Sequence, residues 1–328
     1  MTGEADWIEF LRQRFPRGAG VRVGIGDDAA VLRLPGGSDL VVTTDLLIEG
    51  QHFLREAHPP RAVGWKALAR SLSDCAAMGA RPRWALVALA FPRATPAKWV
   101  KEFFEGIGLL AWRFDVSVAG GDLSIAAQVV ADVQVIGEVR RGRALLRSGA
   151  RPGDLLFVSG TLGLAGLGLA CLRGRVASVR PWVKRALRAQ FFPQPRLDLA
   201  RALPPRAAPT AMIDVSDGLS TDLNHICEAS GVGARLYQEK IPAVNLPAPL
   251  AHRLRTTGLQ LALTAGEDYE LLFTVSAARA RRLPRKLAGV PLTPIGEITR
   301  ERRLVLVDAA GRERLLPPRG WDPFRRRG

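Results

Sequence analysis

The feature that most constrains this chain is a succession of short apolar segments that alternate between strand and helix patterns. Apolar and β-branched runs predict strands at residues 40–48, 84–91, 116–119 and 129–139, and then at 155–158, 211–215, 261–264 and 270–275. Apolar residues at helical spacing predict helices at 6–15, 65–78, 96–114 and 219–230. Strands and helices that alternate in this way are typical of α/β or α+β folds.

The segment 140–154 is the best candidate for a joint between two domains, because it holds five arginines together with Pro152 and Gly153. A chain of 328 residues, 47% of them hydrophobic, is long enough for two such domains. We therefore expect a first domain at 1–140 and a second at 141–328.

The net charge of +16 first suggests a partner that is a nucleic acid or another acidic surface. Residues 1–140, however, carry 16 basic and 16 acidic side chains, so the whole excess lies in the second domain. It consists almost entirely of arginine, because only six of the 47 basic residues are lysine. We interpret it as a solvated basic surface and expect no nucleic-acid partner.

The cysteines and the apolar segments favour a cytoplasmic protein. Three widely spaced cysteines are too few for a disulfide scaffold and fit a reducing compartment. The first residues lack the apolar run of a signal peptide. The uncharged stretch 155–172 is as long as a membrane span, but its glycines favour a strand, a turn and a helix, so we expect no membrane association.

Acidic residues recur at or beside the predicted apolar strands and on one helix. They lie in Gly24-Ile25-Gly26-Asp27-Asp28, at Asp45, at Asp74 on the helix, in Gly120-Gly121-Asp122, in Asp214-Val215-Ser216-Asp217, and in Gly266-Glu267-Asp268. Each has an ordinary alternative: an acidic turn, a strand end facing water, a solvated helix position, or a helix N-cap at Asp217. The first also fits a dinucleotide-binding fingerprint, but paired aspartates would repel a pyrophosphate unless a divalent metal lay between.

Together these carboxylates predict a magnesium site. Oxygen ligands suit Mg²⁺, which usually binds in proteins together with substrate phosphates. The chain has no Walker-type phosphate loop and no protein-kinase signature, and its four histidines are scattered. The residues alone therefore indicate a two-domain, Mg²⁺-dependent enzyme that handles phosphates.

Five segments resemble the thiamine-monophosphate kinase family of the aminoimidazole-ribonucleotide-synthetase-like superfamily. They are GIGDDAAVL (24–32), TTDLLIEGQHF (43–53), SLSDCAAMGARP (71–82), IDVSDGLSTDL (213–223) and GEDYELLFTV (266–275). The resemblance implies ATP-dependent phosphorylation of thiamine monophosphate to thiamine diphosphate. It also implies a homodimer in which the N-terminal sheets pair, a C-terminal α/β domain, and an active site between the two domains.

The resemblance also implies roles for individual residues. The ligands of several Mg²⁺ ions would be Asp28, Thr43, Thr44, Asp45, Asp74, Asp122, Asp214 and Asp217. ATP, the co-substrate, would meet Gly121, Asp122, Arg147 and Ser216. Thiamine monophosphate would meet His52, Glu267 and Trp321, and catalysis would depend on Asp45, Asp122 and Arg147. The chain departs from the family pattern at Leu123, where a hydroxyl residue is common, and at Ala265, where glycine is frequent.

The implied chemistry needs no general base, because the nucleophile would be a phosphate oxygen that is largely ionised at neutral pH. We therefore expect direct in-line transfer without a phospho-enzyme. The alternative is a related ATP-dependent enzyme such as an aminoimidazole ribonucleotide synthetase, and a more remote one is a basic nucleic-acid-binding protein.

Overall fold

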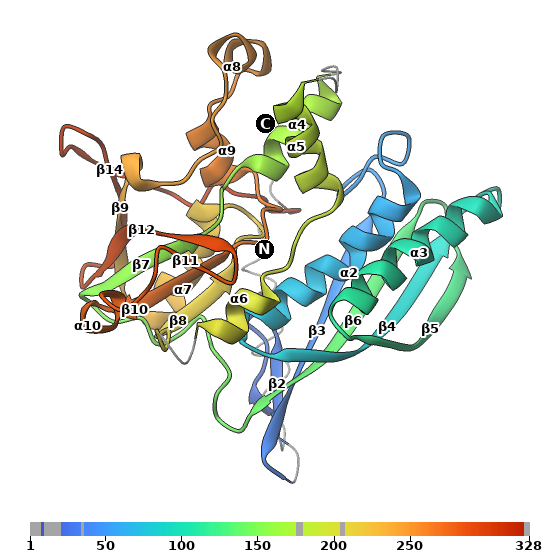
Figure 1. Ribbon diagram of the computed structural model, residues 1–328, viewed down its shortest axis with the longest axis horizontal. Coiled ribbons are helices and arrows are strands. Elements are labelled where there is room, and N and C mark those ends of the chain that lie inside the picture. The colour runs from blue at the N-terminus through green and yellow to red at the C-terminus, as the bar shows by residue number, and fades with distance from the viewer. Residues whose placement is uncertain (1–7, 10–20, 34–35, 175–179, 204–206, 325–328) are drawn as a thin grey trace.

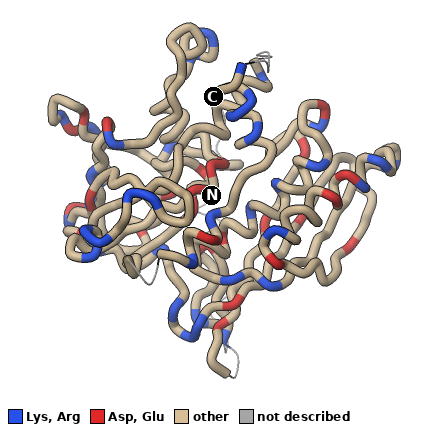
Figure 2. The backbone as a smooth tube through the Cα atoms, viewed as in Figure 1, with Lys and Arg blue, Asp and Glu red and all other residues tan. Residues whose placement is uncertain are grey.

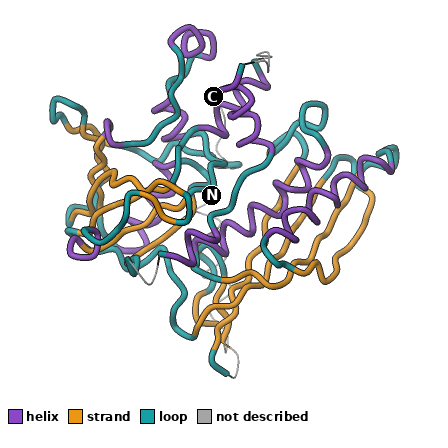
Figure 3. Tube along the Cα trace, in the orientation of Figure 1, coloured by secondary structure: helices purple, strands orange, loops and turns teal. Residues whose placement is uncertain are grey.

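Two β-sheets with flanking helices make up the computed structural model, which describes residues 8–9, 21–33, 36–174, 180–203 and 207–324 (Figure 1). The helix predicted at 6–15 lies almost entirely outside the described residues, as does the arginine-rich C-terminus at 325–328. Figure 3 shows the strands gathered into two groups, with the longest helices lying along one of them.

The first sheet has six strands in the order β1-β2-β3-β6-β4-β5, with β4 and β5 parallel and the other neighbours antiparallel. The strands are β1 (Val21–Val23), β2 (Ala30–Arg33), β3 (Ser38–Ile48), β4 (Arg81–Phe91), β5 (Ser117–Ile125) and β6 (Val130–Arg140). Helices α2 (Pro60–Ala77) and α3 (Ala97–Arg113) cover one face of this sheet.

Strand alternation decides which side chains of the first sheet reach this covered face. On β3, Val41, Thr43 and Leu47 are buried, whereas Thr44 and Leu46 are exposed on the opposite face. Thr43 and Thr44 therefore lie on opposite faces of the first sheet.

The second sheet is built from β7 onward in the order β14-β13-β9-β12-β7-β10-β8, with β11 paired to β12. Its strands are β7 (Asp154–Ser159), β8 (Ala211–Asp214), β9 (Gly233–Tyr237), β10 (Leu271–Ser276), β11 (Lys286–Leu287), β12 (Val290–Thr299), β13 (Leu304–Val307) and β14 (Glu313–Leu315). Its helices are α4 (Leu164–Arg173), α5 (Pro181–Phe191), α6 (Leu197–Ala202), α7 (Leu219–Ser230), α8 (Ala248–Leu254), α9 (Gly258–Thr264) and α10 (Ala277–Ala280), with a 3₁₀ turn at Gln238–Lys240.

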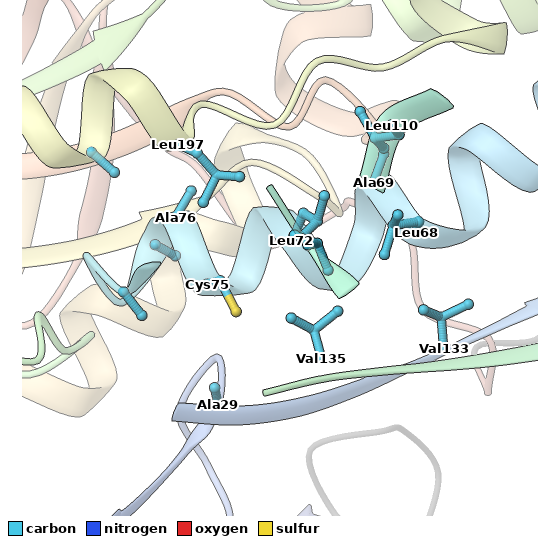
Figure 4. Close-up of a cluster of buried hydrophobic side chains, with 14 of the residues drawn as sticks. Ala29, Leu68, Ala69, Leu72, Cys75, Ala76, Leu110, Val133, Val135 and Leu197 are labelled. Atoms are coloured by element: carbon cyan, nitrogen blue, oxygen red, sulfur yellow. The ribbon is translucent and has the colours of Figure 1, made fainter. Parts of the chain in front are cut away.

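Helix α2 packs against both sheets. Its Leu72 and Cys75 contribute to one core with Val133 and Val135 of the first sheet and Leu197 of α6 (Figure 4). Met212 of β8 and Phe273 of β10 belong to the same buried cluster. One face of α2 is therefore held at the boundary between the two halves of the chain.

Two element predictions are wrong. Residues 261–264 are not a strand but the end of α9, which begins after Thr257, whose hydroxyl accepts a hydrogen bond from the Gln260 amide at 3.1 Å. The strand predicted at 116–119 does not end at its glycines but continues as β5 to Ile125. Gly121 stays in the strand because its φ of +156° brings its backbone against Val87, where a Cβ would lie 1.8 Å from a carbonyl oxygen.

The alternative interpretation of Asp217 as a helix N-cap is also wrong. The N-cap of α7 is Gly218, and Asp222 in the first turn accepts hydrogen bonds from the backbone amides of Asp217 and Gly218, at 3.2 and 3.0 Å. The uncharged stretch 155–172 forms β7 and most of α4, and no described helix has the length and apolarity of a membrane span.

The contact between α2 and α3 depends on glycine. A Cβ at Gly106 of α3 would lie 2.0 Å from the carbonyl oxygen of Arg61 in α2. Gly108, two residues further along α3, has no atom within 4 Å of the same position. Of these two glycines only Gly106 limits the distance between the helices, as Gly64 of α2 does from the other side, where a Cβ would lie 1.9 Å from the carbonyl oxygen of Phe103.

We expect Gly106→Ala to lower the free energy of unfolding by about 1–3 kcal/mol, because the added methyl group forces the helices apart. Gly108→Ala is the matched control and should raise the free energy of unfolding by about 0.5–1 kcal/mol through helix propensity. Urea unfolding of both variants measures the difference. Equal effects of the two substitutions would contradict the close-packing explanation.

Candidate active site between the two sheets

Three carboxylates from distant parts of the sequence meet between the sheets. Asp28 precedes β2, Asp74 lies in the last turn of α2, and Asp214 ends β8; each offers an oxygen within 4.8 Å of the others. Figure 2 shows acidic segments close together near the middle of the view, where the two halves meet. These three aspartates, called the acidic cluster below, are arranged as carboxylates that bind a metal would be.

Each member of the acidic cluster has one fixed polar neighbour. Thr43 Oγ1 donates to Asp74 at 2.5 Å, and Ser73 Oγ donates to Asp214 at 2.6 Å. Arg147 Nη2 donates to Asp28 Oδ1 at 2.7 Å, and the buried Oδ2 of Asp28 has no hydrogen-bond partner among the residues that the structure describes. The single cation at the cluster does not balance three carboxylates, so the site can accept further positive charge.

The pKa values report this excess of negative charge. Burial, followed by repulsion from Asp45, Asp214 and Asp28, raises the pKa of Asp74 well above its ordinary value. Burial and the charge of Asp28 raise the pKa of Asp214 to about 8. A bound divalent cation would favour the ionised forms and reverse both shifts.

A row of polar side chains on α2 extends from the acidic cluster toward the N-terminal end of the helix. Lys66, Arg70 and Asp74 follow one another at intervals of four residues and therefore lie on one face of the helix. Arg70 Nη2 donates to Asp45 at 3.0 Å. Its Nη1 lies 3.4 Å from the hydroxyl oxygen of Tyr269, in the loop before β10.

Lys66 joins the two halves through Glu267. Its Nζ lies 2.6 Å from Glu267 Oε1 and donates to the backbone oxygen of His52 at 2.9 Å. The other oxygen of Glu267 accepts from Gln190 of α5 at 3.0 Å. The rings of His52 and Trp321 lie 6.4 Å apart between centroids.

These surroundings determine the charges of His52 and Glu267. Burial and the positive charge of Arg70 lower the pKa of His52 to about 4, so the imidazole is neutral at pH 7. Its Nδ1 accepts from the Ile48 amide at 2.9 Å, which leaves the proton on Nε2. Burial alone would raise the pKa of Glu267, but Lys66 outweighs it, so the pKa is lowered and the carboxylate is ionised.

The structure brings most of the residues expected at the site to this region. Those near the acidic cluster are Asp28, Thr43, Asp45, Asp74, Arg147 and Asp214, and those grouped around Glu267 and Trp321 are His52, Ser216 and Asp217. Ser216 and Asp217 take part through their backbone oxygens, which accept from the amides of Glu267 and Trp321, at 2.7 and 2.9 Å.

The structure does not bring three expected residues to the acidic cluster. Thr44 projects from the opposite face of β3, where its hydroxyl donates to Asp132. Asp122 lies in the same cross-strand row as Asp132 and Leu46, on that same exposed face. Gly121 is in register with Asp45 but three strands away, about 14 Å at the usual strand spacing.

Sequence reasoning missed Lys66, Arg70 and Tyr269, which link the halves. A signal was present, because both basic residues share a helix face with Asp74 and stand among mostly apolar and small residues. Their partners Glu267 and Tyr269 lie about 200 residues away in sequence. No local pattern could have identified those partners.

Comparison with known proteins gives concordant matches along the chain. Residues 26–139 match the AIR synthase related protein N-terminal domain, and residues 151–309 match the corresponding C-terminal domain. The thiamine-monophosphate kinase of Synechococcus elongatus is 39% identical over 91% of both chains. That of Bacillus subtilis is 34% identical over 98% of this chain and 99% of its own.

Solved structures agree with these matches. AaThiL complexed with AMPPCP and TMP superposes with a TM-score of 0.86 at 32% identity, covering 98% of this chain and 97% of that one. A thiamine-monophosphate kinase from Stenotrophomonas maltophilia superposes with a TM-score of 0.74 at 35% identity, covering 92% and 94%.

We expect Lys66→Met to lower the free energy of unfolding by about 3–5 kcal/mol, because it leaves the Glu267 carboxylate without its counter-charge. The double variant Lys66→Met/Glu267→Gln should recover at least about 1 kcal/mol of that loss. Lys98→Met, which removes an exposed α3 lysine 3.8 Å from Glu102, is the control and should change stability by less than about 0.5 kcal/mol. Additive effects in the double variant, measured by denaturant unfolding, would mean that the two groups are not coupled.

Proposed function

The chain belongs to the thiamine-monophosphate kinases of the AIR synthase related family, and we propose that the region between its two sheets is the active site. The enzyme uses ATP to phosphorylate thiamine monophosphate, which gives thiamine diphosphate and ADP. The observation that carries this conclusion is 34–39% identity to thiamine-monophosphate kinases over most of the chain. The site supports it, because one end is suited to phosphates with cations and the other to an organic ring system.

We infer that the acidic cluster holds Mg²⁺. The atoms that could bind a metal are all oxygens, and one of them is buried without a hydrogen-bond partner among the described residues. The carboxylates also repel one another. A divalent cation would supply the missing partner and neutralise the repulsion. Asp28, Asp74 and Asp214 would bind the metal, with Thr43 and Asp45 beside them. When bound, Mg²⁺ would neutralise charge on the phosphates. Assignments of Thr44, Asp122 and Asp217 as further ligands stay predictions, as does the presence of several ions.

The chain's own residues would position two anionic substrates without acting as a base. His52 is unsuited to abstract a proton near neutral pH, because its pKa is about 4 and Nδ1 is already an acceptor. This supports direct in-line transfer to a phosphate oxygen, which is already ionised. Arg147, together with Gly121, Asp122 and Ser216, is assigned to ATP by family resemblance.

The end of the site around Glu267 is suited to thiamine. The thiazolium ring carries a permanent positive charge, and Glu267 is an ionised carboxylate whose side chain is 19% exposed. Trp321 offers an aromatic face near the neutral His52 ring. These three residues would recognise the organic part of thiamine monophosphate.

We also propose a homodimer formed through the first sheet. Edge strand β5 is exposed along its whole length, and Val118, Leu123 and Ile125 on it are 45–61% exposed. A long apolar edge strand is normally covered in a soluble protein, and a second copy of the sheet would cover it. The proposed boundary between domains at residue 140 and the cytoplasmic location are further predictions; three free, buried cysteines fit the latter.

Incubation of the protein with MgATP and thiamine monophosphate should give equal amounts of ADP and thiamine diphosphate, measured by chromatography. Asp74→Asn should lower kcat by at least about 10²-fold and abolish the rise in Tm caused by Mg²⁺, because it removes a central carboxylate of the acidic cluster. Asp115→Asn, at an exposed position after α3, is the matched control and should keep both properties. ADP formation without thiamine diphosphate would instead favour a related enzyme with another acceptor.

For the dimer, we expect Leu123→Arg to shift the protein from dimer to monomer in light scattering, because it places a charge in the proposed β5 interface. Leu109→Arg, at an exposed position on α3, should leave the dimer intact. A wild-type protein that is monomeric at micromolar concentration would contradict the proposal.

A further inference from the structure

Arg70 lies between the two ends of the proposed site. Its guanidinium donates to Asp45, beside the acidic cluster, and approaches Tyr269, in the loop that carries Glu267. The charge of Arg70 also acts on His52 and Glu267, at the end assigned to thiamine. The phosphate of thiamine monophosphate would have to lie in this region, because it joins the thiamine end to the metal end.

The hydrogen-bonding capacity of Arg70 is incompletely used. A guanidinium has five N–H donors. The bond to Asp45 is 3.0 Å long, the contact with Tyr269 is 3.4 Å, and the buried Nε has no hydrogen-bond partner in the described part of the chain. Because a buried donor without a partner is costly, such a group is expected where a ligand supplies the missing acceptor.

The other cations near the site already have partners or lie elsewhere in it. Lys66 is bound by Glu267 and by the His52 backbone, and Arg196 pairs with Glu270. Arg147 also has a partnerless Nε, but it lies on the far side of the acidic cluster, where it contacts Asp27 and Asp28. Within the described part of the site, Arg70 is therefore the cation with spare donors between the acidic cluster and Glu267.

We propose that Arg70 binds the acceptor phosphate of thiamine monophosphate and positions its attacking oxygen toward the metal end. This inference rests on the proposed function. The planar guanidinium suits a phosphate, because it can donate two hydrogen bonds to two oxygens at once. Burial favours the neutral form of Arg70, but Tyr269, Asp45 and Glu267 outweigh it and keep its pKa above the ordinary value. The positive charge is thus always available.

The test compares two ligands that differ only in the phosphate. Thiamine monophosphate and thiamine are titrated calorimetrically against wild-type protein and Arg70→Gln, without ATP or metal. We expect Arg70→Gln to weaken binding of thiamine monophosphate about ten- to hundred-fold, the range for a lost charge-assisted contact, and binding of thiamine less than threefold. Arg61→Gln, on an exposed part of the same helix, should change neither affinity. Equal losses for both ligands would mean that Arg70 only supports the fold, and would overturn the proposal.

A second variant and a second measurement cover a folding defect in Arg70→Gln. Arg70→Lys keeps the positive charge but loses the planar group that can donate two hydrogen bonds to one phosphate. It should raise KM for thiamine monophosphate at least fivefold while KM for ATP stays within twofold. In ¹⁵N-labelled wild-type protein, an arginine Nε–H resonance should shift with thiamine monophosphate and not with thiamine. The absence of that shift would overturn the proposal without any variant.

Failure of this inference is distinguishable from failure of the proposed function. If wild-type protein forms no thiamine diphosphate, the proposed function is wrong and the role of Arg70 falls with it. If wild-type protein forms thiamine diphosphate but Arg70→Gln keeps the preference for the phosphorylated ligand, only the role of Arg70 is wrong.

Discussion

The structure depends on the burial of one charged face of α2 between two sheets. Lys66, Arg70 and Asp74 are all largely removed from water, and an isolated buried charge is too costly to keep. Each cation therefore needs a carboxylate from a distant segment, which Glu267 and Asp45 provide. The pair Lys66–Glu267 and the contact of Arg70 with Tyr269 also hold the second half of the chain against the first, so the site and the contact between the sheets have one physical origin.

The charge along this helix face changes from one end to the other, and each part suits a different part of the proposed substrates. The acidic cluster has too little positive charge and raises the pKa values of its own members, so it is suited to cations that arrive with ATP. Glu267 and the neutral His52 are suited to the cationic and aromatic parts of thiamine. Arg70 lies between these ends, where the phosphate of the acceptor would be. Among the described arginines of the second half, Arg147 contacts the acidic cluster and Arg196 pairs with Glu270.

Elements with strong periodicity were predictable, and those governed by close contacts were not. Helix α7 has the predicted bounds, and β3, β4 and β6 agree with prediction to within three residues at either end. Residues 261–264 are apolar enough for a strand, but the Thr257 cap starts a short helix that packs with α4 and α7. β5 passes through two glycines because Gly121 must approach the Val87 backbone, and that requirement is not visible in a local pattern.

The sequence by itself determined the composition of the site. Its recurring aspartates predicted oxygen ligands, and the family motifs lie in both halves of the chain. It also determined that Thr43 and Thr44 lie on opposite faces of β3, because strand alternation is a local property. Only the tertiary structure decided that Asp28, Asp74 and Asp214 meet, that Asp122 and Thr44 lie on the opposite face of the first sheet, and that Lys66 and Arg70 join the halves. The physical reason is that these outcomes depend on strand order and on pairing between charges about 20 to 200 residues apart, which local propensity does not encode.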